Sequence, residues 1–145
     1  MGEAEELAQR CAAAMYERDR ASQHLGIEIG DVGPGRALAR MRVGDHMVNG
    51  HNIAHGGYVF LLADNAFAFA CNTYDQVTVA AAAEVVFVSA ARLGDELLAE
   101  AVERTRYGRS GIYDVTVRRA SDDAVIAEFR GHSRSRRERL LAENE

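Results

Sequence analysis

Residues 51–72 read HNIAHGGYVFLLADNAFAFACN, and this stretch decides the fold. From about Gly57 to Asn72 the apolar residues recur at steps of three and four, which predicts a helix, and they cover nearly every side of it. A helix that is apolar all round has to be buried. The sequence therefore predicts a long central helix around which the rest of the chain packs.

Upstream of this helix the sequence predicts a second helix and a hairpin. Residues 3–20 place apolar side chains at helical spacing and end in a charged stretch, which predicts an amphipathic N-terminal helix. The runs at 27–29 and 37–43 alternate around the Gly-Pro-Gly turn signal at 33–35, so we expect them to pair as a hairpin. Residues 44–54 show no period and are expected to form a loop.

Downstream, four runs have the length and composition of strands. Turn residues separate them, and one antiparallel sheet can hold all four together with the hairpin. The runs are 77–88, 96–106, 112–119 and 124–135. The predicted fold class is α+β: an antiparallel sheet wrapped around a long central helix, with an extra N-terminal helix.

Length and composition limit what the chain can be. With 145 residues, of which 48% are hydrophobic, we expect one domain over residues 1–145, with a frayed tail at 136–145. The net charge of −5 argues against nucleic acid as a partner. The acidic amino terminus and the lack of a long apolar run argue against a signal peptide and a membrane span, so we expect a cytoplasmic protein.

The absence of lysine and the spacing of the cysteines and histidines exclude several kinds of chemistry. All 17 residues counted as Lys or Arg are Arg, which excludes Schiff-base formation, a lysine nucleophile and a Walker-type phosphate loop. Cys11 and Cys71 lie far apart without a CxxC pair, so we expect neither a disulfide framework nor a zinc ribbon. His51 and His55 stand four apart, but no Glu follows His51 and the helix starts only at the glycines, so no metal site is expected.

Two features of the 51–72 stretch point to chemistry. Gly56 and Gly57 open the buried helix and leave backbone N–H groups bare at the positive end of its dipole, where they can bind a developing oxyanion. Asp64 is a carboxylate among apolar neighbours, a placement that favours a base or a nucleophile. Two plainer interpretations stay open: a flexible helix entry, and an Asp satisfied by a neighbouring hydroxyl or a partner helix.

One helix cannot bring these two features to one carbonyl group. Eight residues at about 1.5 Å rise each place Asp64 roughly 12 Å beyond Gly56 along the axis. If both act on one substrate, a two-fold dimer brings Gly56 of one chain to Asp64 of the other and creates two equivalent sites. We therefore expect a homodimer at minimum.

The stretch 51–72, the motif GIYD at 111–114 and the motif FRGHS at 129–133 together resemble the phenylacetate-degradation (PaaI-type) family of hotdog-fold acyl-CoA thioesterases. The resemblance spans roughly residues 26–134. It implies a six-stranded hotdog sheet, dimers that often pair into homotetramers, and hydrolysis of aryl-acetyl-CoA or related acyl-CoA thioesters to free acid and CoA. It implies no metal, and no cofactor other than the coenzyme A of the substrate.

By position, the resemblance assigns roles to four residues. Asp64 corresponds to the family's catalytic carboxylate, as a general base or a nucleophile, and we favour the general base. Gly56 would supply the N–H that polarises the thioester carbonyl. Asn49 and His55 would orient the substrate.

Seven further residues are candidate substrate contacts: Gly57, Tyr58, Phe60, Phe67, Thr78, Ala80 and Arg109. Ala80 marks a departure from the wider hotdog group, which often carries a Ser or Thr there to hold the attacking water; Thr78 is the nearest hydroxyl. The aromatic residues could line a pocket for an aromatic acyl group, or belong to the core. Arg109 and neighbouring arginines could meet the phosphates of CoA, or form a solvated strand face.

Two other functions remain open at this point. A hydratase or dehydratase acting on acyl thioesters would share the fold, although such relatives usually place a His or a Glu in the active centre. A non-catalytic acyl-CoA-binding domain would bind CoA without turnover, and the carboxylate at Asp64 argues against it.

Overall fold

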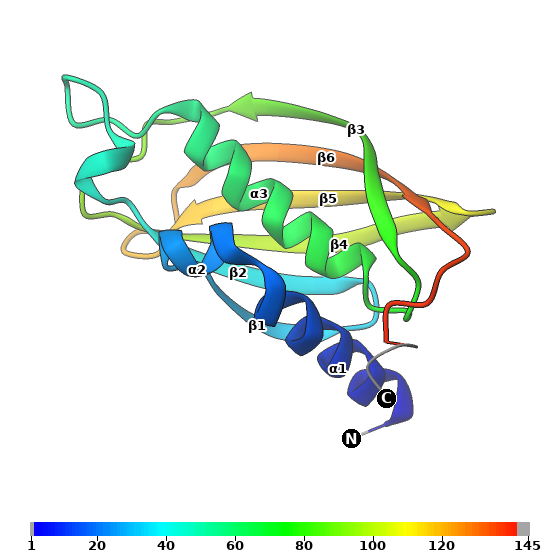
Figure 1. The fold of residues 1–145 in the computed structure, drawn as a ribbon. Helices are drawn as coiled ribbons and strands as arrows, with labels where there is room; N and C mark the ends of the chain where they lie inside the picture. Colours follow the sequence, from blue (N-terminus) through cyan, green and yellow to red (C-terminus); the bar gives the residue numbers. More distant parts are fainter. Residues whose placement is uncertain (1, 142–145) are drawn as a thin grey trace.

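In the computed structural model, which describes residues 2–141, six antiparallel strands form one sheet and a long helix lies across one of its faces (Figure 1). The strand order is β1-β2-β4-β5-β6-β3. The elements are α1 (Glu3–Arg18), α2 (Arg20–Leu25), β1 (Glu28–Gly33), β2 (Arg36–Arg42), a 3-10 turn (Asp45–Met47), α3 (Gly56–Cys71), β3 (Thr78–Phe87), β4 (Glu96–Tyr107), β5 (Ser110–Arg119) and β6 (Val125–Ser135). The predicted fold class, a hotdog sheet around a central helix with an extra N-terminal helix, is confirmed.

The core lies between the sheet and α3. Buried and half-buried side chains alternate along β5, as expected for a sheet with one covered face. The buried residues of α3 are Val59, Leu62, Ala63, Ala66, Phe67, Phe69, Ala70 and Cys71. Many of them are alanines, and so are buried residues of β2 and β4, which allows the helix to lie close to the sheet. Cys11 and Cys71 are free and buried, and no helix within residues 2–141 is both long and apolar enough to cross a membrane.

The N-terminal region forms two helices rather than one. We predicted a single helix over 3–20, but α1 ends at Arg18 and α2 begins at Arg20. Asp19 causes the break, because its carboxylate accepts hydrogen bonds from the Ser22 N–H (3.0 Å) and the Ser22 hydroxyl (2.6 Å) and thereby caps α2. α2 then ends at Leu25, and Gly26 after it forms a left-handed C-cap with a φ of 70°.

The segment that follows β6 packs against the body of the protein as far as Leu141. The prediction of a frayed tail at 136–145 is wrong for 136–141, and 142–145 lie outside the described residues. Asp75 is the anchor: its carboxylate accepts hydrogen bonds from Arg139 Nε (2.8 Å) and the Leu141 N–H (2.8 Å). Burial alone would raise the pKa of Asp75, but the hydrogen bonds from Leu141 and Arg139 outweigh it and hold that pKa below its usual value.

Replacing Asp75 by Asn is expected to lower the melting temperature at pH 7 by roughly 5 °C, because charge-assisted hydrogen bonds worth about 1.5–3 kcal/mol are weakened. Asn tolerates the φ of 59° found at Asp75, so the variant isolates the charge. A carboxylate whose pKa folding lowers adds stability above its unfolded pKa of about 4, and this stability is lost as pH falls through the folded pKa. Thermal melts of the two proteins should therefore draw together as pH falls below about 4. Equal melting temperatures of the wild type and the Asp75→Asn variant at pH 7 would contradict the role of Asp75 as an anchor.

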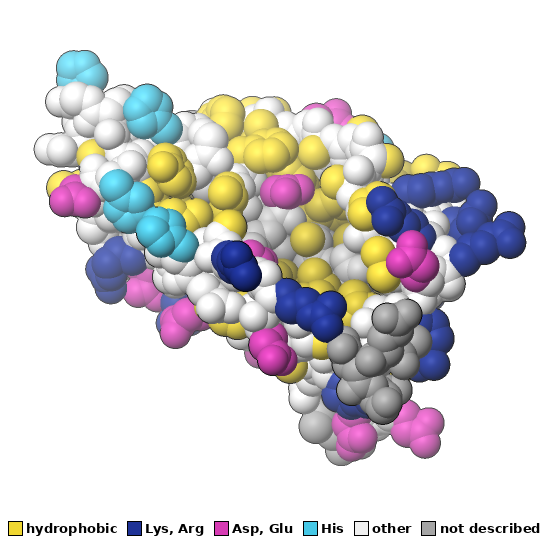
Figure 2. Space-filling view, viewed as in Figure 1, with side chains coloured by type: hydrophobic (Ala, Val, Ile, Leu, Met, Phe, Trp, Pro, Cys, Tyr) yellow, Lys and Arg dark blue, Asp and Glu magenta, His cyan; other side chains and the backbone are white. Residues whose placement is uncertain are grey.

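β3 forms one edge of the sheet and leaves an apolar surface uncovered. It pairs with β6 on one side, and residues 79–84 are exposed. Val86 and Phe87 remain 65% and 53% exposed. In Figure 2 hydrophobic side chains cover much of the face formed by α3 and β3. A long apolar edge strand is a ready template for pairing with another strand.

Candidate active site

Asp64 lies on the side of α3 that faces away from the sheet. Gly57, Leu61, Asp64 and Ala68 recur at steps of three and four residues and none is fully buried, so they form an outward stripe. The Asp64 carboxylate is half-buried and has no hydrogen-bond or ion-pair partner within residues 2–141. Burial raises the pKa of Asp64 above its ordinary value. An unpaired carboxylate in this state is a good proton acceptor.

The second chemical group is the backbone at the start of α3. His55 is the N-cap residue in an extended conformation, and its side chain does not cap the helix. The N–H groups of Gly56 and Gly57 find no backbone acceptor in the described part of the chain, so they stay available at the positive end of the helix dipole. A Cβ atom at Gly56 would lie 2.9 Å from the ring of Phe87, so a larger residue here would push this exposed ring aside.

A mainly apolar groove of about 520 Å³ opens beside Gly56. Its walls are the start of α3, the end of β3 and the loop at 88–91. The lining residues include Ala54, Gly56, Val59, Phe87, Ala91 and Ile126. The volume lies within the range of small-molecule pockets, and the free N–H end of α3 borders it.

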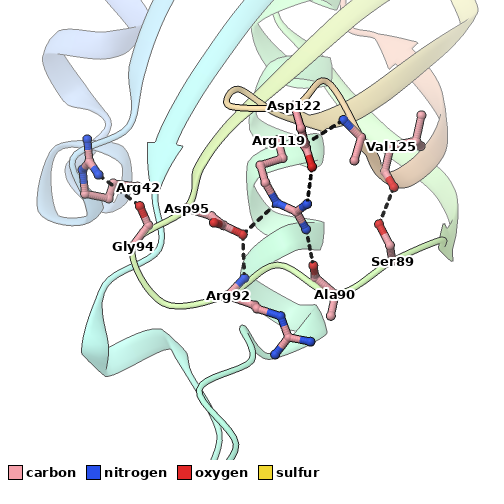
Figure 3. A network of polar contacts seen from close by, with 10 residues as sticks. Arg42, Ser89, Ala90, Arg92, Gly94, Asp95, Arg119, Asp122 and Val125 are labelled. Carbon is pink, nitrogen blue, oxygen red and sulfur yellow. Dashed lines mark hydrogen bonds and ion pairs between the residues drawn. The ribbon is translucent and has the colours of Figure 1, made fainter.

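Arg119, the last residue of β5, holds the loop that forms one wall of this groove (Figure 3). Its guanidinium donates three hydrogen bonds, to Asp95 Oδ2 (3.0 Å), Asp122 Oδ2 (2.9 Å) and the carbonyl oxygen of Ala90 (2.8 Å). The neighbouring carbonyl oxygen of Ala91 accepts the N–H of Ala54 at 2.8 Å. The contacts therefore run from β5 through the loop to Ala54, two residues before Gly56, and fix where α3 starts.

The two predicted orienting residues, Asn49 and His55, lie in the loop before α3. Asn49 Oδ1 accepts the N–H groups of His51 (2.9 Å) and Ile53 (3.1 Å), so this oxygen shapes the loop and only the Nδ2 end is left for a ligand. His55 is exposed beside Gly56. His51 lies in the loop and shares no helix with His55, and no three His, Cys, Asp or Glu side chains gather as metal ligands within residues 2–141.

The aromatic candidates divide between the core and the surface of α3. Phe67 is 1% exposed and packs against Tyr113 and Phe129, with ring centroids 5.7 and 5.8 Å apart. The structure thus places Phe67 in the core, which corrects its assignment as a substrate contact. Phe60 packs on Phe129 at 5.4 Å but keeps part of its ring exposed, and Tyr58 is half-buried. Phe60, Tyr58 and the exposed Gly57 next to Gly56 therefore keep surface that a ligand can touch.

Three predicted substrate contacts do not lie beside Gly56. Thr78 begins β3, close to the C-terminal end of α3, where its N–H donates to Asn72 Oδ1 at 2.9 Å. Ala80 is exposed on the β3 edge, and Arg109 is exposed in the turn between β4 and β5. These residues do not join the groove at Gly56 within one chain. Thr78 and Arg109 meet instead in a second, smaller cavity.

Sequence reasoning missed several residues that shape this region. Phe87 closes the groove, and its only signal was an aromatic residue near the end of a predicted strand. Asn65 follows Asp64, and its Nδ2 donates to Ser22 Oγ, so it ties α3 to α2. Its Oδ1 is buried without a hydrogen-bond partner. A polar residue directly after Asp64 on a buried helix was a visible signal, whereas the role of Arg119 depends on tertiary contacts.

Within one chain, the base and the free amide remain apart. Both belong to α3, where eight residues at about 1.5 Å rise separate Asp64 from Gly56 by roughly 12 Å. The chain therefore presents a proton acceptor at one point of the helix and an oxyanion-binding amide with an apolar groove at another. Together these groups could support addition of water to a carbonyl group.

Known proteins share this sequence pattern. The family model described as the thioesterase superfamily matches residues 51–126, which include both Gly56 and Asp64. The acyl-coenzyme A thioesterase PaaI of Escherichia coli (strain K12) is 41% identical over 122 residues, which cover 84% of this chain and 86% of that protein.

Solved structures share the fold. The E. coli PaaI protein from the phenylacetic acid degradation operon matches with a TM-score of 0.90 and 37% identity, over 93% of this chain and 97% of that one. A mutant of the phenylacetic acid degradation protein PaaI from Thermus thermophilus matches with a TM-score of 0.76 and 30% identity, over 80% and 98% of the two chains.

Proposed function

Because the chain belongs to the thioesterase superfamily, as a thioester hydrolase of the PaaI type, we propose that it hydrolyses aryl-acetyl-CoA thioesters such as phenylacetyl-CoA or hydroxyphenylacetyl-CoA to free acid and CoA. The observation that carries the proposal is Asp64, an unpaired, half-buried carboxylate with a raised pKa on the outward stripe of α3. The substrate class is supported by the relatives, which are named for acyl-CoA hydrolysis and for phenylacetic acid degradation.

In the proposed reaction Asp64 acts as a general base. It takes a proton from a water molecule as the water oxygen bonds to the thioester carbonyl carbon. The N–H of Gly56 binds the oxygen that becomes negatively charged, and the tetrahedral intermediate then expels the CoA thiolate, which receives the proton from Asp64. The scheme uses coenzyme A only as part of the substrate, and the absence of a metal or other cofactor stays a prediction.

We infer that the catalytic site is shared between two chains. The roughly 12 Å between Gly56 and Asp64 along α3 excludes joint action within one chain. The uncovered β3 edge, with Val86 and Phe87 largely exposed, supports pairing of two chains along β3. A two-fold axis at this edge would bring each Asp64 towards the partner's Gly56, giving two equivalent sites per dimer. The PaaI-type resemblance further favours pairing of two such dimers into a homotetramer.

The groove beside Gly56 is the proposed place for the aryl group. It is lined mainly by apolar side chains and borders the amide that would bind the thioester oxygen. Burial of a phenyl ring contributes roughly 25 cal/mol for each Å² of apolar surface removed from water. The groove would therefore favour aryl-acetyl groups over short aliphatic ones.

Release of free thiol from a panel of acyl-CoA esters tests this function. We expect kcat/KM for phenylacetyl-CoA to exceed that for acetyl-CoA by at least about tenfold, because the ring adds buried apolar area. Product analysis separates hydrolysis from hydration of the acyl chain, and saturable binding without turnover would indicate a non-catalytic domain. If no acyl-CoA in the panel yields thiol, the proposal is wrong.

A further inference from the structure

Arginine side chains gather at the end of the molecule where the β4–β5 turn and the segment after β6 lie (Figure 2). Arg109 and Arg137 are exposed there, and neither side chain has a hydrogen bond or an ion pair within the described residues. The Arg134 side chain contacts only the neutral Ser110 hydroxyl, at 3.3 Å. In a chain with a net charge of −5, these side chains form a local excess of positive charge that no carboxylate of residues 2–141 pairs with.

Beneath these arginines lies a small, mostly enclosed cavity of about 30 Å³. Arg106 and Arg109 line it together with hydroxyl groups from three strands, those of Thr78, Ser110, Tyr113, Ser133 and Ser135. Arg106 is held over the ring of Tyr74, 3.7 Å from its centroid, and contacts Glu103 at 3.5 Å. The volume suffices for one or two oxygen atoms with their hydrogen bonds, and is too small for a whole phosphate group.

Ser133 contributes to this cavity a hydroxyl that no other group of residues 2–141 uses. The residue is 5% exposed and lines the cavity, yet its hydroxyl makes no hydrogen bond to any described residue. Gly111 keeps the space open, because a Cβ atom there would lie 2.8 Å from Ser133 Oγ. A hydroxyl that no protein group uses can exchange a hydrogen bond with an oxygen atom that enters the cavity from outside.

We propose that the cavity and its arginines bind a phosphate group, with one phosphate oxygen entering to reach Ser133 while Arg106 and Arg109 hold the others at the mouth. The guanidinium fork suits a phosphate bidentately, which a single ammonium group would not. The preferred source is the 3′-phosphate of the acyl-CoA substrate, and in that form the inference rests on the proposed function. Free phosphate is the other source of the same chemistry.

The position of the cavity along α3 agrees with a long substrate. Cys71 lines the cavity and follows Asp64 by seven residues, so the cavity lies roughly 10 Å from Asp64 along the helix. It lies in the direction opposite to Gly56. A substrate whose thioester is at Asp64 can therefore extend a flexible arm towards the arginines without crossing the aryl groove.

Steady-state kinetics with phenylacetyl-CoA and 3′-dephospho-phenylacetyl-CoA test the site. We expect the KM of the dephospho substrate to be about tenfold higher at unchanged kcat, because charge-assisted hydrogen bonds are lost. Ser133→Ala and Arg109→Gln should each raise the KM of phenylacetyl-CoA towards the dephospho value and leave the KM of the dephospho substrate unchanged. Arg40→Gln, which removes an exposed arginine that pairs with Glu96, is the matched control and should change neither KM.

A direct binding experiment separates the two phosphate sources and does not need turnover. Line broadening of inorganic phosphate in ³¹P NMR spectra should appear with the wild type and be lost with Ser133→Ala. Binding of phosphate together with equal KM values for the two substrates would assign the site to free phosphate. If the two substrates have equal KM values and inorganic phosphate does not bind, the proposed phosphate site is wrong. If the protein does not hydrolyse acyl-CoA, the phosphate spectra still test the site, because they do not depend on turnover.

Discussion

Replacing Asp64 by Asn should lower kcat for phenylacetyl-CoA by about a thousandfold, because a general base contributes roughly 10²–10⁴ to the rate. Asn keeps the shape of the side chain and removes only the proton acceptor. The wild-type kcat should rise with pH through the pKa of Asp64, which burial holds above its ordinary value, and the variant should lose this dependence. Thiol release measured across pH gives both quantities.

The same substitution makes a second, opposite prediction for stability. An Asp whose pKa folding raises binds its proton more tightly in the folded state, so its charged form costs stability as pH rises past the unfolded pKa of about 4. Asp64→Asn should therefore raise the melting temperature at pH 7. Asp45→Asn is the control, since the Asp45 side chain is 94% exposed and should affect neither measurement. If the Asp64→Asn variant keeps more than a tenth of the wild-type activity, Asp64 is not the general base.

Most of the fold follows from local sequence patterns. The apolar stretch at 51–72 predicts α3 through its helical period, and the four later runs predict β3 to β6 through their length, their composition and the turn residues between them. The boundary at Asp19 escaped because the residues around it continue a helical pattern, and its capping of Ser22 becomes visible only in the folded chain. The anchoring of 136–141 escaped because it depends on Asp75, distant in sequence.

Only part of the candidate site follows from residue types, and its catalytic roles stay predictions. Gly56 and Asp64 carry their chemistry in their residue types, and the structure places both on α3 with the spacing that the helix rise dictates. Phe67 is a different case, since its outward or inward direction depends on packing against Tyr113 and Phe129. The unpaired hydroxyl of Ser133 is likewise a tertiary property. A sequence shows which side chains can react, and tertiary contacts decide which of them remain available.

Gly56→Pro should reduce kcat by about 10²–10³, because it deletes a backbone N–H that binds the oxyanion. Proline is tolerated at the first position of a helix, and His55 before it already adopts the extended φ of −60° and ψ of 140° that precede a proline. Gly56→Ala is the matched control: it brings the same Cβ contact with Phe87, 2.9 Å away, but keeps the N–H. If kcat falls further in the Pro variant than in the Ala variant, the difference is due to the missing N–H of residue 56.

Two kinds of isolated heterodimer then decide whether the site is shared. A heterodimer of a Gly56→Pro chain and an Asp64→Asn chain should have about half the activity of a wild-type dimer, since one of its two sites combines an intact amide with an intact carboxylate from different chains. A heterodimer of a wild-type chain and a chain carrying both substitutions should be inactive, since each site then holds one defect. Sites confined to single chains predict the reverse: no activity in the first heterodimer and half in the second. Differently tagged, co-expressed chains allow both to be purified, and thiol release distinguishes the two arrangements without reference to the structure.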